Sequence, residues 1–173
     1  MKIAINGFGR IGKLVLRAFL EKKLKNVKIV AINELGSLDS SIHLLKYDSI
    51  HGILNSKITK TKYGMKIDNN NIKFYSEKDP SKLPWKTLKV DIVLECSGVF
   101  TSKEKAVAHI FAGAKKVIIS APATNVDKTI VQGVNNQQLS RKDNIISNGS
   151  CTTNCLAPLA MILDKSLGIE SGF

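Results

Sequence analysis

A cysteine stands in a short polar stretch, residues 147–155 (SNGSCTTNC), at an expected passage from strand to helix. The apolar residues 144–146 predict the strand, and the apolar run 156–163 is long enough for the helix. Ser150 is a good N-cap because its hydroxyl can accept a hydrogen bond from a free backbone N–H. Cys151 would then lie in the first helical turn, where the helix dipole stabilises an anion. A thiolate there is a usable nucleophile, and the alternative is a buried cysteine that only packs.

A glycine-rich turn follows the first apolar segment of the chain. Residues 2–6 predict a strand, and residues 7–12 (GFGRIG) match the pattern G-x-G-x-x-G. A second strand is expected at 27–33, and Glu34 directly after it stands about 20 residues beyond Gly12. A glycine motif between strand and helix, with an acid at that distance, predicts a dinucleotide site.

Each residue of this motif has an expected role. Gly7 permits the tight turn, Gly9 lets the backbone approach a pyrophosphate, and Gly12 lets the following helix pack close to the sheet. Glu34 can accept hydrogen bonds from the ribose hydroxyls of adenosine, and its charge would repel a 2′-phosphate. The motif therefore favours NAD over NADP, and the alternative is a tight turn that binds no ligand.

Apolar residues after the glycine turn recur with the period of a helix. Ile11, Leu14, Val15, Ala18 and Phe19 stand at i, i+3, i+4, i+7 and i+8. This spacing predicts that they share one buried face of the helix.

The rest of the chain alternates predicted strands and helices. Strands are expected at 90–95, 116–120, 130–131 and 144–146, helices at 39–47 and 103–112, and hairpin pieces between 53 and 75. Residues 96–100 (CSGVF) follow a strand and would lie where doubly wound sheets bind ligands. The order predicts an α/β fold of Rossmann type, with a doubly wound, mostly parallel sheet and a β-hairpin insertion.

The composition is ordinary for a globular protein, with 43% hydrophobic and 23% charged residues among 173. No apolar run reaches the length of about 20 residues that spans a bilayer, and no signal peptide is expected. Three cysteines argue against a disulfide framework and favour the cytoplasm. The net charge of +12 allows a nucleic-acid partner, but the lysines are dispersed and aromatics make up only 6%, so attraction of phosphorylated substrates is favoured.

The other cysteines and the tryptophan have structural interpretations. Cys151 and Cys155 are one helical turn apart, but without a second pair of ligands no metal is expected. Cys96 is interpreted as a packing residue. Trp85 is interpreted as a packing residue at a loop.

The glycine motif and the cysteine segment resemble the phosphorylating glyceraldehyde-3-phosphate dehydrogenase family. The matching pieces are residues 5–12, 43–49, 120–123 and 147–158. The resemblance implies that Cys151 attacks the aldehyde of glyceraldehyde 3-phosphate to form a hemithioacetal. Hydride would then pass to NAD, leaving a thioester, and inorganic phosphate would release 1,3-bisphosphoglycerate, as in glycolysis.

The resemblance also implies the site residues. Ser150 and Thr152 match family residues that hydrogen-bond phosphate. With the glycines Gly7, Gly9, Gly12 and Gly98, the positions expected to contact NAD are Phe8, Arg10, Ile11, Asn33, Glu34, Lys78, Ser97 and Ser120. A homotetramer is implied for the full-length protein of the family.

The chain departs from the family pattern at a few positions. Glu34 stands where most members have Asp, and Gly149 stands where Ala is usual. Glu34 and residues 83–85 also resemble the related erythrose-4-phosphate dehydrogenases, whereas residues 120–123 favour the glyceraldehyde enzyme, so the substrate stays open. A non-catalytic NAD- or RNA-binding module is the rival interpretation, but such a module has no need of an activated thiol at Cys151.

The family has a second, catalytic domain that supplies a histidine base and an arginine for phosphate. We expect residues 1–150 to form the NAD-binding domain and residues 151–173 to form the cysteine helix and the start of a truncated catalytic domain. The chain is thus interpreted as an N-terminal part of such an enzyme, inactive by itself. Apolar residues of the segment 156–163 should then be exposed.

Overall fold

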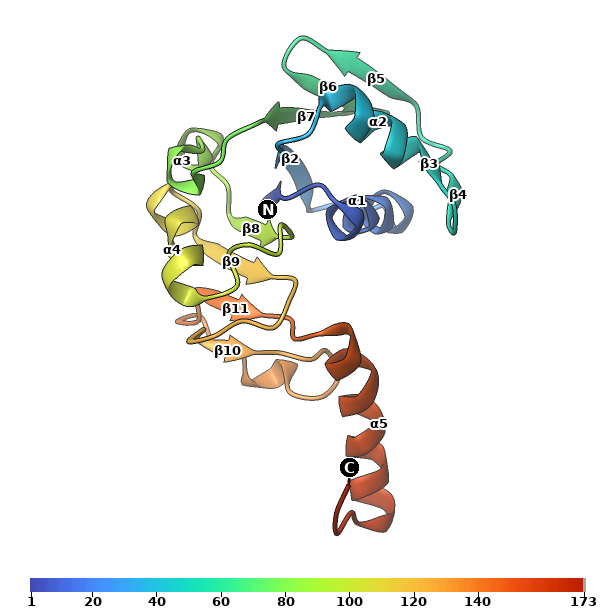
Figure 1. Cartoon of the computed structure of the whole chain (residues 1–173), viewed down its shortest axis with the longest axis vertical. Helices are drawn as coiled ribbons and strands as arrows, with labels where there is room; N and C mark the ends of the chain where they lie inside the picture. Colours follow the sequence, from blue (N-terminus) through green and yellow to red (C-terminus); the bar gives the residue numbers. More distant parts are fainter. Residues whose placement is uncertain (173) are drawn as a thin grey trace.

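The computed structural model describes residues 1–172, which form an α/β fold around a nine-stranded sheet (Figure 1). The strands are β1 (Lys2–Asn6), β2 (Lys28–Asn33), β3 (Tyr47–Asp48), β4 (Gly52–Ile53), β5 (Ile58–Thr61), β6 (Gly64–Ile67), β7 (Asn70–Tyr75), β8 (Ile92–Glu95), β9 (Lys116–Ile119), β10 (Lys128–Thr129) and β11 (Ile145–Ser147). The helices are α1 (Arg10–Lys22), α2 (Leu38–Lys46), α3 (Trp85–Leu88), α4 (Lys103–Phe111) and α5 (Cys151–Leu167), with 3₁₀ turns η1 (Pro80–Lys82) and η2 (Asn136–Gln138).

The sheet is mostly parallel, as expected. Its strand order is β10-β11-β9-β8-β1-β2-β7-β6-β5, and every pair from β10 to β7 is parallel. The β5–β6 and β6–β7 pairs are antiparallel, which confirms the predicted hairpin insertion at that edge. The short strands β3 and β4 form a separate two-stranded sheet.

The helices cover both faces of the sheet, which makes it doubly wound. Figure 1 shows α1 and α2 on one side of the sheet and α3 and α4 on the other. The side chains of β1 follow this division: Ile3 and Ile5 pack with Leu16 of α1, whereas Ala4 packs with Trp85 of α3. This alternation is the period of two expected of a strand buried on both faces.

The buried face of α1 differs from the prediction. Ile11 and Ala18 are exposed, while Gly12, Leu16 and Arg17 are buried. The guanidinium of Arg17 turns inward and donates to backbone carbonyls at the C-terminal end of α2 and in β4. Its nitrogens lie 2.8 Å from Leu45 O, 3.1 Å from Lys46 O and 2.9 Å from Gly52 O.

The strand expected at 130–131 lies two residues earlier, as β10. The amide of Ile130 still donates to Ser147 O at 2.8 Å, but the amide of Val131 donates to Asn135 Oδ1 at 2.8 Å. This side-chain bond turns the chain away from β11 and ends the strand.

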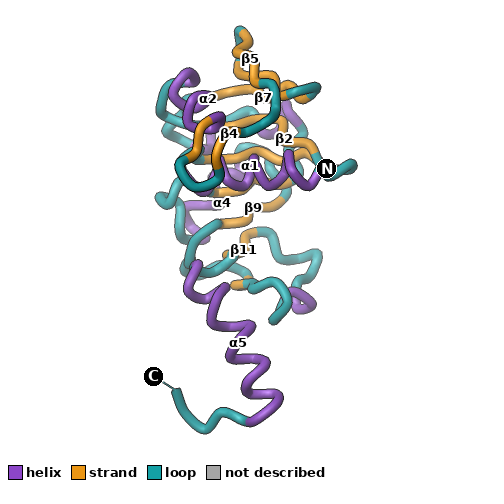
Figure 2. Tube along the Cα trace, turned by 90° about the vertical axis from the view of Figure 1, so that its right-hand side faces the viewer, coloured by secondary structure: helices purple, strands orange, loops and turns teal. Residues whose placement is uncertain are grey.

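The last helix, α5, stands apart from the sheet. Figures 1 and 2 show it extending from the end of β11 away from the sheet. None of its residues is buried, and its exposed apolar side chains include Leu156, Leu159, Ile162 and Leu163, as expected. The predicted range 151–173 is described as far as residue 172. Within residues 1–172 no helix is long and apolar enough to cross a membrane.

Candidate cofactor cleft and nucleophile

The predicted site residues gather where the parallel strands of the sheet end, which we call its carboxyl edge. The carboxyl ends of six parallel strands lie there, because parallel strands share their direction; these strands are β11, β9, β8, β1, β2 and β7. The residues that follow them include Cys151, Ser120, Ser97, Gly7, Glu34 and Lys78. Four strand spacings separate the ends of β2 and β11, a span of about 19 Å. Dinucleotides bind along such an edge.

The glycine turn lies where the winding of the sheet reverses, between β1 and β8. Gly7 has a φ of +85°, and a Cβ there would lie 2.4 Å from Ser97 N, so a side chain is excluded. A Cβ on Gly12 would lie 2.3 Å from Gly7 O and 3.2 Å from Ile5 Cγ2, which confirms that glycine is needed for close packing on β1. A Cβ on Gly9 would meet nothing within 4 Å, so this position faces open space.

The N-terminus of α1 opens onto the same space. Gly9 is its N-cap, and no side chain accepts a hydrogen bond from its first amides. Free amides at a helix start are donors for a phosphate oxygen. Arg10 and Ile11 are exposed beside them, and Arg10 pairs with Asp48 at 2.9 Å. Phe8 is fully buried, and its backbone N–H donates to Glu34, so its predicted cofactor contact is not seen in the exposed surface of the site.

Glu34 is fastened to the glycine turn. Its Oε2 accepts from Phe8 N at 2.6 Å, and its Oε1 accepts from Gly36 N at 2.9 Å. Burial alone would raise the pKa of Glu34, but backbone hydrogen bonds and the nearby Lys13 charge outweigh it and hold the pKa below its ordinary value. Burial lowers the pKa of Lys13 against the attraction of Glu34. Glu34 is therefore a carboxylate at neutral pH.

A cleft of about 250 Å³ opens between the ends of β1, β2 and β8. Its lining contains Asn6, Gly7, Asn33, Glu34, Leu35, Glu77, Lys78, Ser97, Val99 and Phe100. Five of these residues, Gly7, Asn33, Glu34, Lys78 and Ser97, were predicted from the sequence as cofactor contacts. The apolar members Val99 and Phe100 belong to the segment 96–100, which was expected where ligands bind. Leu35 was not predicted, although its exposed position directly after Glu34 was an available signal.

Asn33 links two segments that line this cleft by hydrogen bonds to Asn6 and Glu77. Its Nδ2 donates to Asn6 Oδ1 at 2.7 Å and to Glu77 O at 2.8 Å, while its Oδ1 accepts from Glu77 N at 2.9 Å. The side chain is buried and its hydrogen-bonding groups are occupied. Asn33 thus shapes the cleft by holding Glu77 beside β2.

Cys96 and Ser120 lie side by side after β8 and β9. Burial raises the pKa of the Cys96 thiol to about 11, and a hydrogen bond with Ser120 only partly opposes this. Cys96 also packs against the core cluster around β1, which confirms its packing role. The amide of Ser120 donates to Glu95 O at 2.9 Å and continues the β8–β9 pairing.

Helix α5 begins at Cys151, as predicted, and Ser150 is its N-cap. The hydroxyl of Ser150 accepts from Thr153 N at 2.9 Å. Before the cap, Ser147 Oγ donates to Ala121 O at 2.7 Å and accepts from Gly149 N at 3.0 Å. These bonds fix the turn between β11 and α5, and the Cys151 side chain is exposed in the first helical turn.

No histidine lies beside Cys151 in the described part of the chain, residues 1–172. His109 is fully buried on the far side of β8, between Trp85 and Glu95. His43 belongs to α2 and His51 to the turn between β3 and β4, at the opposite end of the molecule from α5 (Figures 1 and 2). Among residues 1–172, no three His, Cys, Asp or Glu side chains form a cluster suited to a metal ion.

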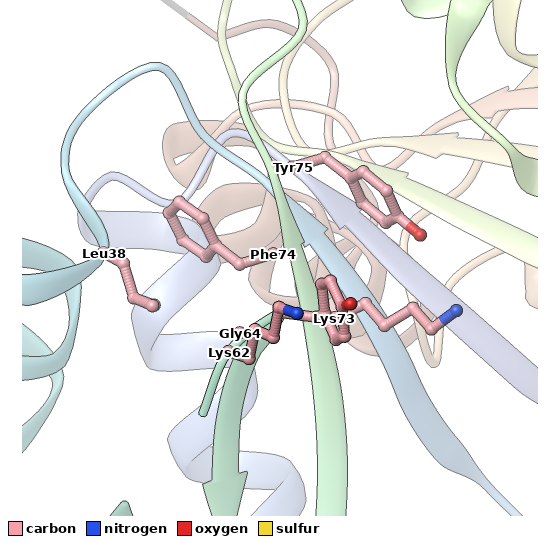
Figure 3. A pocket seen from close by; sticks show the side chains of 7 residues that line it. Leu38, Lys62, Gly64, Lys73, Phe74 and Tyr75 are labelled. Atoms are coloured by element: carbon pink, nitrogen blue, oxygen red, sulfur yellow. The ribbon is translucent and has the colours of Figure 1, made fainter. Parts of the chain in front are cut away.

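A second hollow, of about 370 Å³, lies on the hairpin side of the molecule. Figure 3 shows Phe74 and Leu38 on one side of β7, with Lys73 and Tyr75 directed to the other. The hollow contains none of the predicted site residues. It is therefore separate from the cleft at the glycine turn.

Comparisons with known proteins agree with this geometry. The family model for the glyceraldehyde 3-phosphate dehydrogenase NAD binding domain matches residues 1–103. Glyceraldehyde-3-phosphate dehydrogenase from Clostridium acetobutylicum is 53% identical over 172 residues, covering 99% of this chain and 51% of that protein. The enzyme of the same name from Xanthobacter flavus is 47% identical over 173 residues, covering 100% and 52%.

The chain spans about half the length of the curated relatives it matches. The family model covers all ten residues that line the cleft, among them Gly7, Glu34 and Ser97. The chain therefore belongs to the glyceraldehyde 3-phosphate dehydrogenase family and carries that family's NAD-binding domain.

Proposed function

We propose that this chain provides the NAD site and the nucleophilic thiol of a phosphorylating glyceraldehyde-3-phosphate dehydrogenase. The observation that carries the proposal is the position of Cys151 at the start of α5, on the sheet edge that also bears the glycine turn. A module that only binds NAD needs the glycine turn but no thiol, whereas an aldehyde dehydrogenase of this type needs the glycine turn and the Cys151 thiol. Residues 1–150 are proposed as the NAD-binding domain and 151–173 as the start of a catalytic part.

The residues at the cleft suit NAD. The uncapped start of α1 offers amides to the pyrophosphate, and the open space at Gly9 gives it access. Glu34 offers a carboxylate to the ribose hydroxyls, although it also bonds the turn through Phe8 N. Arg10, Ile11, Lys78, Ser97, Gly98 and Ser120 are proposed as further contacts. NAD, when bound, supplies the hydride acceptor.

Cys151 is proposed as the group that attacks the aldehyde carbon of a phosphorylated substrate. Ser150 and Thr152 flank it and are proposed to hydrogen-bond phosphate, either of the substrate or inorganic. For the full-length protein we propose a homotetramer and a cytoplasmic setting, in keeping with three free cysteines. The product would be 1,3-bisphosphoglycerate, and the pathway glycolysis.

A fusion tests the proposal. Residues 1–172 would be joined to the part of the Clostridium acetobutylicum relative that lies beyond the match. We expect NAD- and phosphate-dependent turnover of about 1 s⁻¹ or more with glyceraldehyde 3-phosphate. Cys151→Ser should lower it at least about a thousandfold, while Cys155→Ser, one helical turn away, should leave most of it. A folded fusion that binds NAD without oxidising either substrate would contradict the proposal.

Erythrose 4-phosphate is the alternative substrate, which the resemblance at Glu34 and residues 83–85 favours. The same fusion distinguishes the two, because the ratio of kcat/KM values reports which aldehyde is preferred. A preference for erythrose 4-phosphate would change the substrate while keeping the role of Cys151.

A further inference from the structure

A chain of buried polar side chains runs from α3 through α4 to the cofactor cleft. Trp85 Nε1 donates to His109 Nδ1 at 3.1 Å, and His109 Nε2 lies 2.9 Å from Glu95 Oε2. All three residues are at most 1% exposed. Buried polar groups need an explanation, and simple packing would have been served by apolar residues.

The direction of these hydrogen bonds is determined by chemistry. An indole N–H can only donate, so His109 Nδ1 accepts and carries no proton. His109 is then the neutral Nε2–H tautomer, and it donates to Glu95. Trp85 thus sets the tautomer that faces Glu95.

Four neutral donors surround the Glu95 carboxylate. Oε2 accepts from His109 Nε2 and from Asn6 Nδ2 at 2.6 Å, and Oε1 accepts from the Ser97 amide at 2.8 Å and from the Ser97 hydroxyl. Because a carboxylate only accepts, the amide nitrogen of Asn6 must face Glu95 and its oxygen must face away. That oxygen accepts from Asn33 Nδ2 at 2.7 Å.

The two groups of donors that Asn6 and Ser97 provide to Glu95 both reach the cleft. Asn6, Asn33 and Ser97 line it, and Asn33 Oδ1 fixes the amide of Glu77, another lining residue. The ring of His109 also stacks edge to face with Phe100, with 6.1 Å between the ring centroids. His109 therefore supports the cleft from behind without lining it.

We propose that His109 is a positioning residue for NAD. By donating from Nε2 it orients Glu95, and Glu95 in turn holds Asn6 and Ser97 at the switch point of the sheet. The inference rests on NAD being bound in this cleft, as in the proposed function. It adds a role for residues that do not touch the cofactor.

A pair of matched variants separates positioning from packing. His109→Leu introduces an apolar side chain of similar volume, which leaves the Trp85 indole without its acceptor and removes one of the four donors to Glu95. His109→Gln keeps an acceptor for Trp85 and a donor for Glu95. We expect the Kd for NAD to rise about tenfold or more in His109→Leu and to return close to the wild-type value in His109→Gln.

Two controls complete the set of variants. Val117→Ala removes buried volume in β9 without touching the polar chain, and it should leave the Kd for NAD unchanged at temperatures where the protein is folded. Trp85→Phe keeps an aromatic ring but removes the indole donor together with some buried volume, and Val117→Ala serves as the control for that lost volume. If His109→Leu fails to fold, a raised Kd in Trp85→Phe carries the same test.

Amide hydrogen exchange gives a readout that does not depend on NAD. The amides of Ser97 and Glu77 should exchange faster in His109→Leu, because their acceptors lose orientation, while that of Met65 in β6 should not. The proposal is overturned if Leu and Gln at 109 weaken NAD binding equally, or if these amides exchange as in the wild type. A wild type that binds no NAD but shows the exchange effect would contradict the proposed function and leave the hydrogen-bond chain supported.

Discussion

The carboxylate of Glu34 accepts a hydrogen bond from the backbone amide of Phe8, with 2.6 Å between Oε2 and N. This contact joins the end of β2 to the glycine turn across 26 residues of sequence. It places a negative charge beside the turn before any cofactor is present. The 2′-phosphate of NADP would be repelled by this charge.

Cofactor preference should follow from this charge. The chain should bind NAD more tightly than NADP, and Glu34→Ala should lower NAD affinity about tenfold, since a hydrogen bond to a charged group contributes about 1.5–3 kcal/mol. Glu34→Gln keeps an acceptor for Phe8 N and removes the charge, so NADP affinity should rise. Titration calorimetry of the three proteins with both cofactors measures the six affinities, and equal or tighter NADP binding to the wild type would contradict the prediction.

The three cysteines should differ in reactivity. Cys151 and Cys155 are exposed, whereas burial raises the pKa of the Cys96 thiol to about 11. With iodoacetamide near neutral pH we expect Cys151 to be modified first and Cys96 at least about a hundredfold more slowly, since the thiolate is the reacting form. Peptide mass spectrometry over time measures each rate. The assignment of the nucleophile is wrong if Cys96 or Cys155 reacts before Cys151.

Acid stability should depend on Asp127. A hydrogen bond from the Lys103 ammonium, with amide bonds from Asn144 and Ile145, lowers the pKa of Asp127 to about 2 although burial opposes this. Because the folded-state pKa is below the unfolded one, the stabilisation is present above about pH 4 and is lost as the pH falls toward about 2.

Asp127→Asn should therefore lower Tm by about 2–5 °C at pH 6, and the two proteins should converge near pH 2. Melting curves followed by circular dichroism between these pH values test this. Asp39→Asn, which removes only an exposed pair with Lys60, is the control and should shift Tm little. A constant difference in Tm across the pH range would argue against the prediction.

Local signals explain which parts were predictable from the sequence. The start of α5 and the glycine turn depend on neighbouring residues, an N-cap serine before an apolar run and glycines between strand and helix, so both were located correctly. The buried face of α1 was not, because the Arg17 side chain lies inward and donates to carbonyls of α2 and β4. Such a contact depends on segments distant in sequence.

The cleft shows the same limit. Gly7, Glu34 and Ser97 were predicted because each follows a strand or matches a motif. The contact of Phe100 with His109 requires α4 to return across β8, and no spacing in the sequence reports it. Trp85 was correctly interpreted as a packing residue, but it begins helix α3 and does not lie at a loop. Its hydrogen bond to His109 depends on the placement of two helices.

The 173-residue chain by itself should have negligible dehydrogenase activity. His109 is buried in the polar chain behind the cleft, and His43 and His51 lie at the other end of the molecule, so none can take a proton at Cys151. General base catalysis contributes about 10²–10⁴ in rate. An assay with glyceraldehyde 3-phosphate, erythrose 4-phosphate, NAD and phosphate tests this, and turnover of about 1 s⁻¹ or more would show that another group serves as base.

The apolar side of α5 should make the chain self-associate. Leu156, Leu159 and Leu163 recur at i, i+3 and i+7 and are all exposed. Sedimentation coefficients should rise with concentration in the micromolar range, and the double change Leu156→Lys and Leu163→Lys should suppress the rise. Lys165→Glu alters charge on the same helix without removing apolar area and serves as the control. A monomer at about 100 μM would exclude this surface as an association site.

Helix α5 extends from the turn at Gly149, two residues before Cys151. Helix α5 has 17 residues and is about 25 Å long, and nothing on the sheet holds its outer turns. A tilt of about 10° at the turn would move the far end by about 4 Å but the neighbouring Cys151 by less than about 1 Å. A change in the tilt of α5 therefore displaces the Cys151 thiol less than any later residue of the helix. The distance from this thiol to the glycine turn depends little on the orientation of α5.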